Sequence, residues 1–308
     1  MILVVSLAAS VSAWAQPVGY AINSRGNFQD SSKVFALWRI DLATGAETYI
    51  GWTGRGDFID IEGIAFDSEG RLYGADDSED TLLRIGTETG NAIPVGGSVR
   101  NMGISTDISM DFGMTFTCEG QLLVSSAGEE SLYIADTETG ALESVGSLGA
   151  PIVDMATIGS TIYGIGLGTD GDGNQLAPNL YRIDMTAPAA ELIGPLGNGA
   201  SPYNQAGLAA DESGRLWAIT DRNRVANNSS SELPSEILRI DPASGAATRV
   251  AETIVGIESL AITPPGECSR GTPQQALAVS ALSIPALWLL ALVVLAVATA
   301  PLRRLTAS

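Results

Sequence analysis

Short segments in which apolar residues alternate with polar ones recur along the chain, and each ends in residues typical of a tight turn. The recurring segments are FALWRIDLATGAE, TLLRIGTETGNA, SLYIADTETGAL, NLYRIDMTAPAA and EILRIDPASGAA. Their turn residues are spaced by 45, 50, 48 and 57 positions and are Gly45, Gly90, Gly140, Pro188 and Gly245. Alternation with a period of two predicts β-strands, and a repeat of roughly 40 to 50 residues is typical of the blades of a β-propeller.

A second recurring segment precedes most of these copies and predicts two more strands joined by a turn. It reads IEGIAFDSEGRLYGAD from residue 61, FGMTFTCEGQLLVSSA from 112, a shortened IVDMATIGSTIYGIGL from 152 and QAGLAADESGRLWAIT from 205. We expect Gly70 to take the positive φ of the first hairpin, and Asp41 with Gly45 to form the turn between the third and fourth strands. One unit is therefore a four-stranded antiparallel meander, which buries its two faces only when similar units pack against it.

The two ends of the repeat region are expected to complete one unit together. The first unit lacks its opening strand and begins with VGYAIN at residue 18, whereas GIESLAITPP at residues 256–265 matches the missing strand. Pairing of these strands would close the ring and leave no open sheet edge. The predicted fold class is all-β, a five-bladed β-propeller. A β-sandwich is the alternative, but it does not require complementary ends.

GIAFDSEGRLYGAD resembles the repeat of the NHL and gluconolactonase-like propellers, and LYRID with a following TGA is similar to repeats of secreted bacterial propellers. Gluconolactonase-like enzymes hold a divalent cation at the mouth of the central channel with carboxylate and amide ligands. The resemblance therefore implies candidate metal ligands on the first strand of each blade. These candidates are Glu62, Asp111, Asp154 and Glu258. Carboxylates that are solvated or that cap backbone groups are the favoured interpretation of these residues, and metal ligands are the alternative. Ca²⁺ is the candidate cofactor, because it prefers oxygen ligands.

A separate acidic run follows the second strand of the second unit and comprises Asp76, Asp77, Glu79 and Asp80. We interpret this run as a solvated turn, since charged residues between two strands usually face water. Weak cation binding is the alternative for this run.

Charge and composition narrow the classes of function. Lys and Arg number 16 against 35 Asp and Glu, and the formal net charge is −19, so no nucleic-acid partner is expected. The chain has no His, which excludes Ser-His-Asp and Cys-His catalysis. We assign no catalytic residue, and an enzyme is the less favoured interpretation. The two cysteines, Cys118 and Cys268, can pair if the protein is exported to an oxidising compartment.

Both ends of the chain carry targeting features. Residues 1–15 are mostly apolar and end in Ala13-Trp14-Ala15 before Gln16, which predicts a cleaved signal peptide, with a buried first strand as the alternative. Residues 284–302 carry no charge, and these 19 residues would form a helix of about 28 Å, close to the thickness of the hydrocarbon core of a membrane. Arg303 and Arg304 follow directly, so the C-terminus is predicted inside and the propeller outside.

The tail resembles the IPTL-CTERM tails of exported proteins of Gram-negative bacteria, which are similar to PEP-CTERM tails. The matching residues are Ile284, Pro285, Ala286, Leu287 and Trp288, then the Leu-rich span and Arg303-Arg304. The resemblance implies two partners, the export machinery and an exosortase-type processing enzyme. An ordinary single-span membrane anchor is the alternative.

The predicted organisation is a signal peptide at residues 1–15, a propeller at 16–265, a linker at 266–282 and a sorting or transmembrane segment at 283–308. The propeller is expected in the periplasm, anchored to the inner membrane, or at the cell surface after the tail is processed. There it would act as a binding or structural module for an unknown surface ligand. A divalent-cation-dependent, lactonase-like hydrolase with its site in the channel is the alternative.

Overall fold

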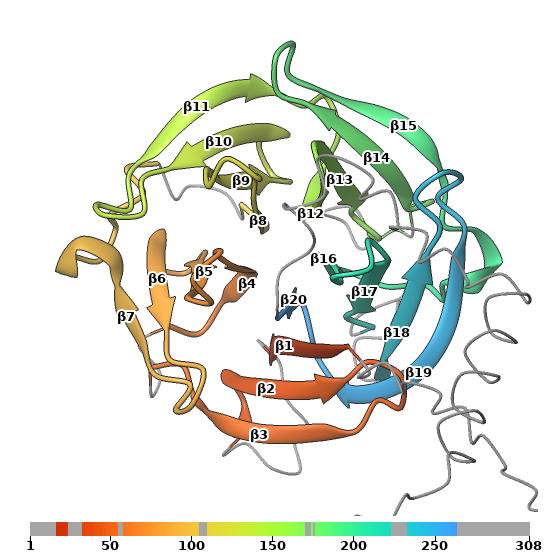
Figure 1. The fold of residues 1–308 in the computed structure, drawn as a ribbon, viewed down its shortest axis with the longest axis horizontal. Helices are drawn as coiled ribbons and strands as arrows, with labels where there is room; N and C mark the ends of the chain where they lie inside the picture. The colour runs from red at the N-terminus through yellow and green to blue at the C-terminus, as the bar shows by residue number, and fades with distance from the viewer. Residues whose placement is uncertain are drawn as a thin grey trace, which may run out of the picture. The chain divides into compact units, whose positions relative to one another are not determined.

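The computed structural model describes residues 17–23, 33–54, 58–104, 110–169, 174, 176–222 and 233–263. These residues form five antiparallel sheets of four strands each, arranged as the blades of a ring (Figure 1). The fold is therefore an all-β, five-bladed propeller, as the sequence predicts. Two short 3₁₀ turns, Val95–Gly97 and Gly197–Gly199, lie wholly within the described residues.

In each blade the strands follow one another from the axis of the ring outwards. Blade 1 contains β20 (Ala261–Ile262), β1 (Val18–Asn23), β2 (Ala36–Asp41) and β3 (Glu47–Trp52). Blade 2 contains β4 (Ile61–Phe66), β5 (Leu72–Asp76), β6 (Thr81–Ile85) and β7 (Ala92–Pro94). Blade 3 contains β8 (Phe112–Phe116), β9 (Leu122–Ser126), β10 (Ser131–Ala135) and β11 (Leu142–Ser147). Blade 4 contains β12 (Ile152–Ile158), β13 (Thr161–Gly166), β14 (Asn179–Asp184) and β15 (Ala189–Pro195). Blade 5 contains β16 (Ala206–Ala210), β17 (Leu216–Thr220), β18 (Pro234–Ile240) and β19 (Ala247–Val255).

Blade 1 takes its strands from both ends of the described chain. The short strand β20 pairs with β1 through Gly19 with Ile262 and Tyr20 with Ala261. A single antiparallel bridge joins Asn23 to Ile257, before β20 begins. The segment that precedes β20 thus continues to follow β1 along the inner edge of the blade.

The turn chemistry within the blades is as predicted. One carboxylate oxygen of Asp41, Oδ1, accepts hydrogen bonds from the backbone N–H groups of Ala43 at 2.9 Å and Thr44 at 3.0 Å. Gly45 completes that turn at a φ of 76°, and Gly70 takes the same positive φ in the hairpin between β4 and β5. The aspartate supplies the acceptors and the glycine supplies the backbone conformation that a side chain disfavours.

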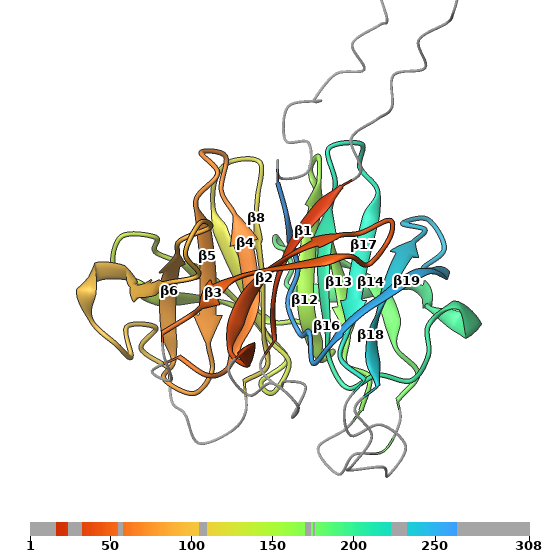
Figure 2. The same ribbon diagram turned by 90° about the horizontal axis from the view of Figure 1, so that it is seen from below.

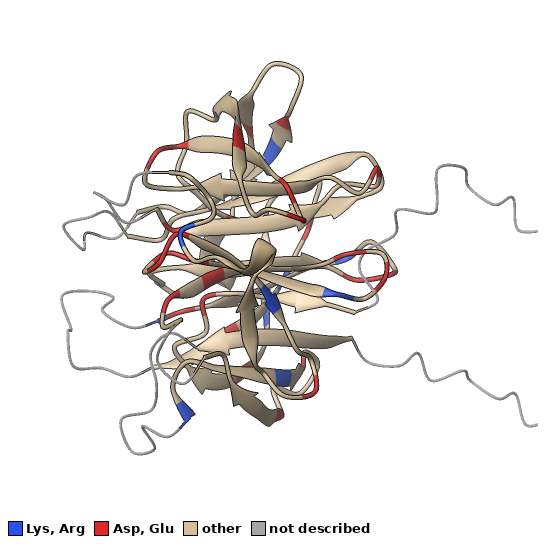
Figure 3. Ribbon diagram, turned by 90° about the vertical axis from the view of Figure 1, so that its left-hand side faces the viewer, with Lys and Arg blue, Asp and Glu red and all other residues tan. Residues whose placement is uncertain are grey.

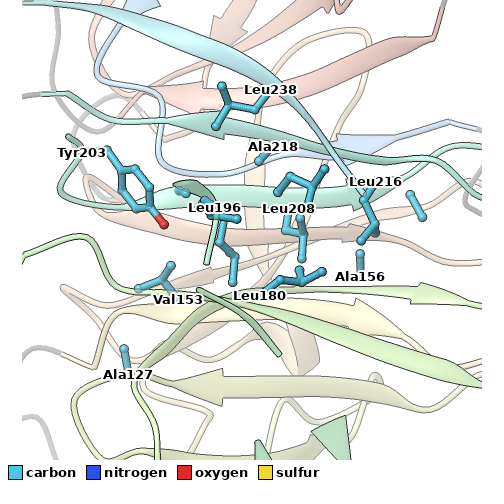
Figure 4. Packing of buried hydrophobic residues seen from close by; sticks show 14 residues of the cluster. Ala127, Val153, Ala156, Leu180, Leu196, Tyr203, Leu208, Leu216, Ala218 and Leu238 are labelled. Carbon is cyan, nitrogen blue, oxygen red and sulfur yellow. The ribbon is translucent and has the colours of Figure 1, made fainter. Parts of the chain in front are cut away.

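Packing between neighbouring blades buries the faces that one meander leaves open. The buried apolar residues fall into five clusters, each dominated by two adjacent blades. Figure 4 shows the cluster between blades 4 and 5, in which Val153 and Leu180 face Leu208 and Leu238. Burial decreases from the axis outwards, since every residue of β4 is buried whereas β11 is largely exposed. Apolar surface between blades is thus the main source of stability.

The inner strands run across the thickness of the ring and come very close to one another (Figure 2). A Cβ atom added to Gly113 would lie 2.3 Å from Cα of Asp154, and one added to Gly207 would lie 2.3 Å from the backbone nitrogen of Leu260. A Cβ added to Gly63 would lie 2.9 Å from the carbonyl oxygen of Phe112. These glycines occupy equivalent repeat positions. We call the level of the channel that they occupy the glycine level.

Asp154 lies at the glycine level of blade 4 and links three inner-strand segments. Its Oδ1 accepts the N–H groups of Met114 at 2.9 Å and Met155 at 2.8 Å, and its Oδ2 accepts that of Leu208 at 2.6 Å. The side chain is fully buried, and burial raises its pKa well above the usual range while the three N–H donors oppose that shift. Asp154 therefore satisfies backbone donors of β8 and β16 that have no strand partner on that side.

The predicted signal peptide (residues 1–15), the linker (266–282) and the tail (283–308), with Ile284 to Trp288, Arg303 and Arg304, lie outside the described residues. Within the described ranges, no helix has the length and apolar character needed to cross a membrane. The targeting expectations therefore stay predictions.

We predict that Asp154→Ala destabilises the propeller strongly. The substitution leaves three buried N–H groups without an acceptor, and we expect a loss of about 3 to 5 kcal/mol in the free energy of unfolding. Urea denaturation followed by circular dichroism measures this change.

The matched control is Glu143→Ala, because Glu143 is an exposed carboxylate on the outer strand β11. We expect that control to change stability by less than about 0.5 kcal/mol. Equal stability of the two variants would show that Asp154 does not hold the inner strands together.

Candidate metal centre

Three carboxylates meet where the inner strand of blade 2 begins. Asp60 precedes β4, Glu62 lies within it, and Asp77 follows β5 in the neighbouring loop. One oxygen from each of these residues lies within 4.8 Å of the others. Glu62 is buried, whereas Asp60 and Asp77 are partly exposed, so the group opens toward solvent on one side. Together with Asp111, Glu258 and Gln205, we call this group the acidic cluster.

Glu62 is held in place by groups from two other blades. Its Oε2 accepts the backbone N–H of Phe112 at 2.8 Å, at the start of β8. The side-chain Nε2 of Gln205, which precedes β16, lies 3.3 Å from Glu62 Oε1 and 2.5 Å from Oδ1 of Asp111. Gln205 is buried, so its amide crosses the channel and joins blade 5 to the carboxylates of blades 2 and 3.

Backbone hydrogen bonds fix the two partly exposed members. Asp77 Oδ1 accepts the N–H of Met110 at 3.0 Å, and the N–H of Asp77 donates to the carbonyl oxygen of Asp60 at 2.9 Å. The N–H of Asp60 donates to Asp76 Oδ2 at 3.0 Å. Asp111 has a φ of 44°, an uncommon conformation for a residue with a side chain. These backbone hydrogen bonds and the backbone conformation of Asp111 thus fix the loops around the cluster.

The electrostatics of the cluster are unfavourable for an ionised Glu62. Burial is the largest cause that raises the pKa of Glu62 well above its usual value of 4.5, and the charges of Asp111, Asp77, Asp60 and Glu258 raise it further. A proton or a cation relieves this repulsion. Carboxylate oxygens are hard donors, so the residues present fit Ca²⁺ or Mg²⁺ and not a metal that prefers thiolate.

Of the four candidate ligands predicted from the sequence, Glu62 belongs to the group of three carboxylates within 4.8 Å. Asp111 shares the Gln205 amide with Glu62, and the charges of Asp111 and Glu258 raise the pKa of Glu62. Asp154 does not join the acidic cluster, because its two oxygens bind backbone N–H groups at the glycine level.

Sequence reasoning missed Asp60 and Gln205, and it offered Asp77 as a cation ligand only in the alternative interpretation of the acidic run. Asp60 and Gln205 each precede an inner strand by one residue. A polar residue directly before an inner strand was the sequence feature that could have identified them. Asp77 had been placed in a turn with no link to the channel, and its proximity to Glu62 depends on the path of the loop after β5.

The interpretation of residues 76 to 80 as a solvated turn is wrong for two of its members. Asp76 and Asp80 are 0% and 1% exposed. Asp76 Oδ1 accepts the hydroxyl of Ser78 at 2.7 Å and the N–H of Glu79 at 2.8 Å. The Asp76 carboxylate therefore accepts hydrogen bonds from the turn that follows it, because a short turn next to a buried strand must satisfy its backbone donors internally.

Acidic positions lie throughout the ring, with fewer Lys and Arg between them (Figure 3). Many of the basic residues are paired, as Arg71 is with Asp67 and Glu69, and Arg182 is with Glu191. Cys118 lies in the hairpin between β8 and β9, with its sulfur 2.7 Å from the carbonyl oxygen of Gly159. Cys118 is disulfide-bonded in the structure. Cys268, the other cysteine of the sequence, lies outside the described residues.

Comparisons with known proteins add structural likenesses. No protein-family model matches the chain, and no curated protein matches it either. A protein of unknown function from Bacteroides caccae is similar in structure at 11% identity, with a TM-score of 0.48, over 80% of this chain and 99% of that one. Virginiamycin B lyase from Staphylococcus aureus is similar at 13% identity, with a TM-score of 0.39, over 71% of this chain and 63% of that one. The assignment of this chain as a five-bladed propeller follows from its own sheet topology.

Proposed function

We propose that this protein is an exported β-propeller that binds a divalent cation of the Ca²⁺ type at the acidic cluster and acts as a binding or structural module. The observation that carries the cation proposal is the meeting of Asp60, Glu62 and Asp77 within 4.8 Å. Like charges this close, with one of them buried, are stabilised by a bound cation or by a bound proton. A cation would join loops of blade 2 into one rigid rim.

The pKa of Glu62 gives the proposal a pH dependence. Because the folded protein holds a proton on Glu62 above the usual value of 4.5, the folded state binds more protons than the unfolded state there. Stability without a cation therefore falls as the pH rises from 4.5 through the raised pKa of Glu62. A cation must displace that proton, so its affinity rises over the same range.

We predict that Ca²⁺ binds the full chain more tightly at pH 8 than at pH 5.5 and that Glu62→Gln weakens binding at pH 8 at least about tenfold, or about 1.4 kcal/mol. The neutral amide removes one charged ligand and lowers the repulsion that favours cation uptake. Isothermal titration calorimetry with CaCl₂, after removal of bound metal with a chelator, measures both effects.

Glu143→Gln serves as the control, since it also neutralises one carboxylate but on the exposed face of β11. In chelator at pH 8, Glu62→Gln is expected to raise the melting temperature, by roughly 2 to 4 °C per kcal/mol of repulsion removed. Absence of Ca²⁺ and Mg²⁺ binding to the wild type, or equal binding to both variants, would refute the cation proposal.

Export and the fate of the tail form the second part of the proposal. The support comes from the apolar N-terminus with Ala13-Trp14-Ala15 and from the order of apolar span and arginines in the last 26 residues. The processing enzyme would be an exosortase-type transpeptidase, and the module would then act in the periplasm or at the cell surface on a ligand not yet identified.

We predict that the mature protein from its own host begins near Gln16 and ends before Leu287. Intact-mass spectrometry measures both ends. Retention of Arg303 and Arg304 would leave only the single-span anchor. A non-reducing digest of the same sample should yield a peptide linked through Cys118 and Cys268, because export places both thiols in an oxidising compartment. Free thiols at both positions would count against export.

A metal-dependent hydrolase of lactones is the second candidate function. The observation that favours it is Glu62, a carboxyl group with a raised pKa beside other carboxylates, which is an arrangement that general acids share. The module proposal predicts no hydrolysis of simple δ-lactones with or without Ca²⁺, as followed by pH-stat titration. Hydrolysis that Glu62→Gln abolishes, with the fold intact by circular dichroism, would establish the hydrolase instead.

A further inference from the structure

The inner strand pair of blade 1 is held by fewer backbone contacts than the inner pairs of the other blades. The strands β20 and β1 pair through two residue pairs, Gly19 with Ile262 and Tyr20 with Ala261. The inner pairs β4–β5, β8–β9 and β16–β17 have five residue pairs each, and β12–β13 has six. Blade 1 therefore has the least regular pairing next to the channel.

Blade 1 also lacks the covalent connection that joins the two inner strands of each other blade. A short hairpin links β4 to β5, β8 to β9, β12 to β13 and β16 to β17, and each hairpin lies at the end of the channel opposite to the acidic cluster. The inner strands of blade 1 instead come from opposite ends of the described chain. Within the described residues, no hairpin holds β20 next to β1.

Side chains support the segment that leads into β20. The Oγ of Ser259 accepts the N–H of Ile22 at 3.1 Å, and the N–H of Ile257 donates to Oγ of Ser235 at 3.2 Å. Leu260 is buried in the apolar cluster between blades 1 and 5. These contacts lie before β20, so the end of that strand depends on packing and on its two pairs with β1.

A disulfide is anchored at this same end of the channel. Cys118 lies in the hairpin between β8 and β9 of blade 3, and it is disulfide-bonded. The sequence has two cysteines, so the partner of Cys118 within the chain is Cys268, which follows Ile262 by six residues. Cys118 and Ile262 line one cavity of about 570 Å³, a separation that six residues can span because they reach about 20 Å when extended. The disulfide thus ties the chain after β20 to another blade.

The two blades that the disulfide joins are not neighbours. Blade 2 stands between blade 1 and blade 3 (Figure 1). The hairpin that carries Cys118 is in turn fixed to blade 4. Its sulfur lies 2.7 Å from the carbonyl oxygen of Gly159, and the hydroxyl groups of Thr115 and Thr157 share a hydrogen bond at 3.1 Å. The anchor of the disulfide therefore belongs to a well-packed part of the ring.

Such a cross-link has a global and a local effect. The loop that it closes covers about half of the sequence, including all of blades 4 and 5. A cross-link restricts the unfolded chain, and the effect grows with the length of the loop. Locally, a β20 strand that separates from β1 stays tethered within a few residues of its place, which raises its effective concentration for pairing again.

We propose that the disulfide between Cys118 and Cys268 is a redox-sensitive latch that holds β20 in blade 1 and keeps the ring closed. In the oxidised protein, β20 stays paired with β1. In the reduced protein, β20 separates from β1 more readily than the other inner strands separate from their partners, and blade 1 opens before the rest of the ring unfolds. Closure by this latch does not depend on a cation at the acidic cluster.

The chemistry of the latch is a two-electron exchange. The two thiols form the disulfide by exchange with the disulfide of an oxidant, which takes up two electrons and two protons and becomes a dithiol. Oxidising compartments supply oxidants of this class. A water-soluble phosphine reverses the step, because the disulfide takes up two electrons and two protons while the phosphine becomes a phosphine oxide with oxygen from water.

Thermal unfolding of the full chain in chelator, with and without the phosphine, tests the latch. We expect complete reduction, verified by thiol titration, to lower the melting temperature of the wild type by at least about 5 °C. The double variant Cys118→Ser/Cys268→Ser should melt at the lower temperature and show no response to the phosphine. A wild-type melting temperature that complete reduction leaves unchanged overturns the proposal.

Hydrogen exchange followed by mass spectrometry distinguishes a latch on β20 from a bond that only adds general stability. Well below the melting temperature, we expect peptides from β1 to exchange at least about tenfold faster in the reduced wild type, because β1 loses its inner partner. Peptides from β12 and β13 should change less than about twofold. Equal acceleration in blades 1 and 4, or none in β1, overturns the proposal.

Leu208→Ala is the matched control, because it removes a fully buried side chain from the cluster between blades 4 and 5 and keeps both cysteines. We expect it to lower the melting temperature without a selective loss of protection in β1. The same loss in β1 as in the double serine variant would show that general destabilisation is sufficient, which overturns the latch. Reduction of the folded wild type gives the decisive comparison if the serine variant fails to fold.

Discussion

The close approach of the inner strands around the axis of the ring is the constraint on which the rest of this structure depends. Gly113 and Gly207 stand where a Cβ atom would lie 2.3 Å from the backbone of the next blade. Glycine at these positions lets the backbones of neighbouring blades approach, whereas blade 4 has Asp154 at the equivalent position. Carboxylates gather at the end of the channel where the inner strands begin.

Inner strands pair with a neighbour on one side only, so their other edge must find hydrogen-bond acceptors within the channel. Carboxylates meet part of this need. Asp154 accepts from Met114 and Leu208, and Glu62 accepts from Phe112. Buried charge near the axis is therefore a consequence of the one-sided pairing of the inner strands as well as a candidate for function. Any assignment of a site in such a channel has to separate these two origins.

The fold could be predicted from the sequence because the same pattern of strands and turns recurs in each repeat. Each copy carries the alternation of its strands and a turn with an aspartate and a glycine, as Asp41 and Gly45 do. The candidate site was only partly predictable. Glu62 was found through its repeat position, but Asp77 reaches the cluster through the path of a loop. No local pattern encodes such a path, because it depends on how blade 2 sits against blade 3.

Asp154 shows how residue type and repeat position point in different directions. It was a candidate metal ligand because it is an acidic residue on an inner strand, yet its repeat position is that of Gly63, Gly113 and Gly207, and its oxygens cap backbone N–H groups. A carboxylate at a position where other blades have glycine has little space except toward the backbone of its neighbours. The repeat position of Asp154 therefore indicated its structural role, whereas its acidic side chain suggested metal binding.

The contrast between Asp154 and Glu62 is the physical reason for proposing a cation at one and not at the other. Both are buried, and burial raises the pKa of both. Asp154 receives three backbone N–H donors that stabilise its charge, and its pKa is raised by burial alone. Glu62 instead faces the charges of four further carboxylates. A carboxylate that only caps the edge of an inner strand has to accept a backbone hydrogen bond. Like charges around such a carboxylate do not stabilise it. Their arrangement costs stability unless a cation or a proton lies among them, and only the cation keeps every member ionised at neutral pH.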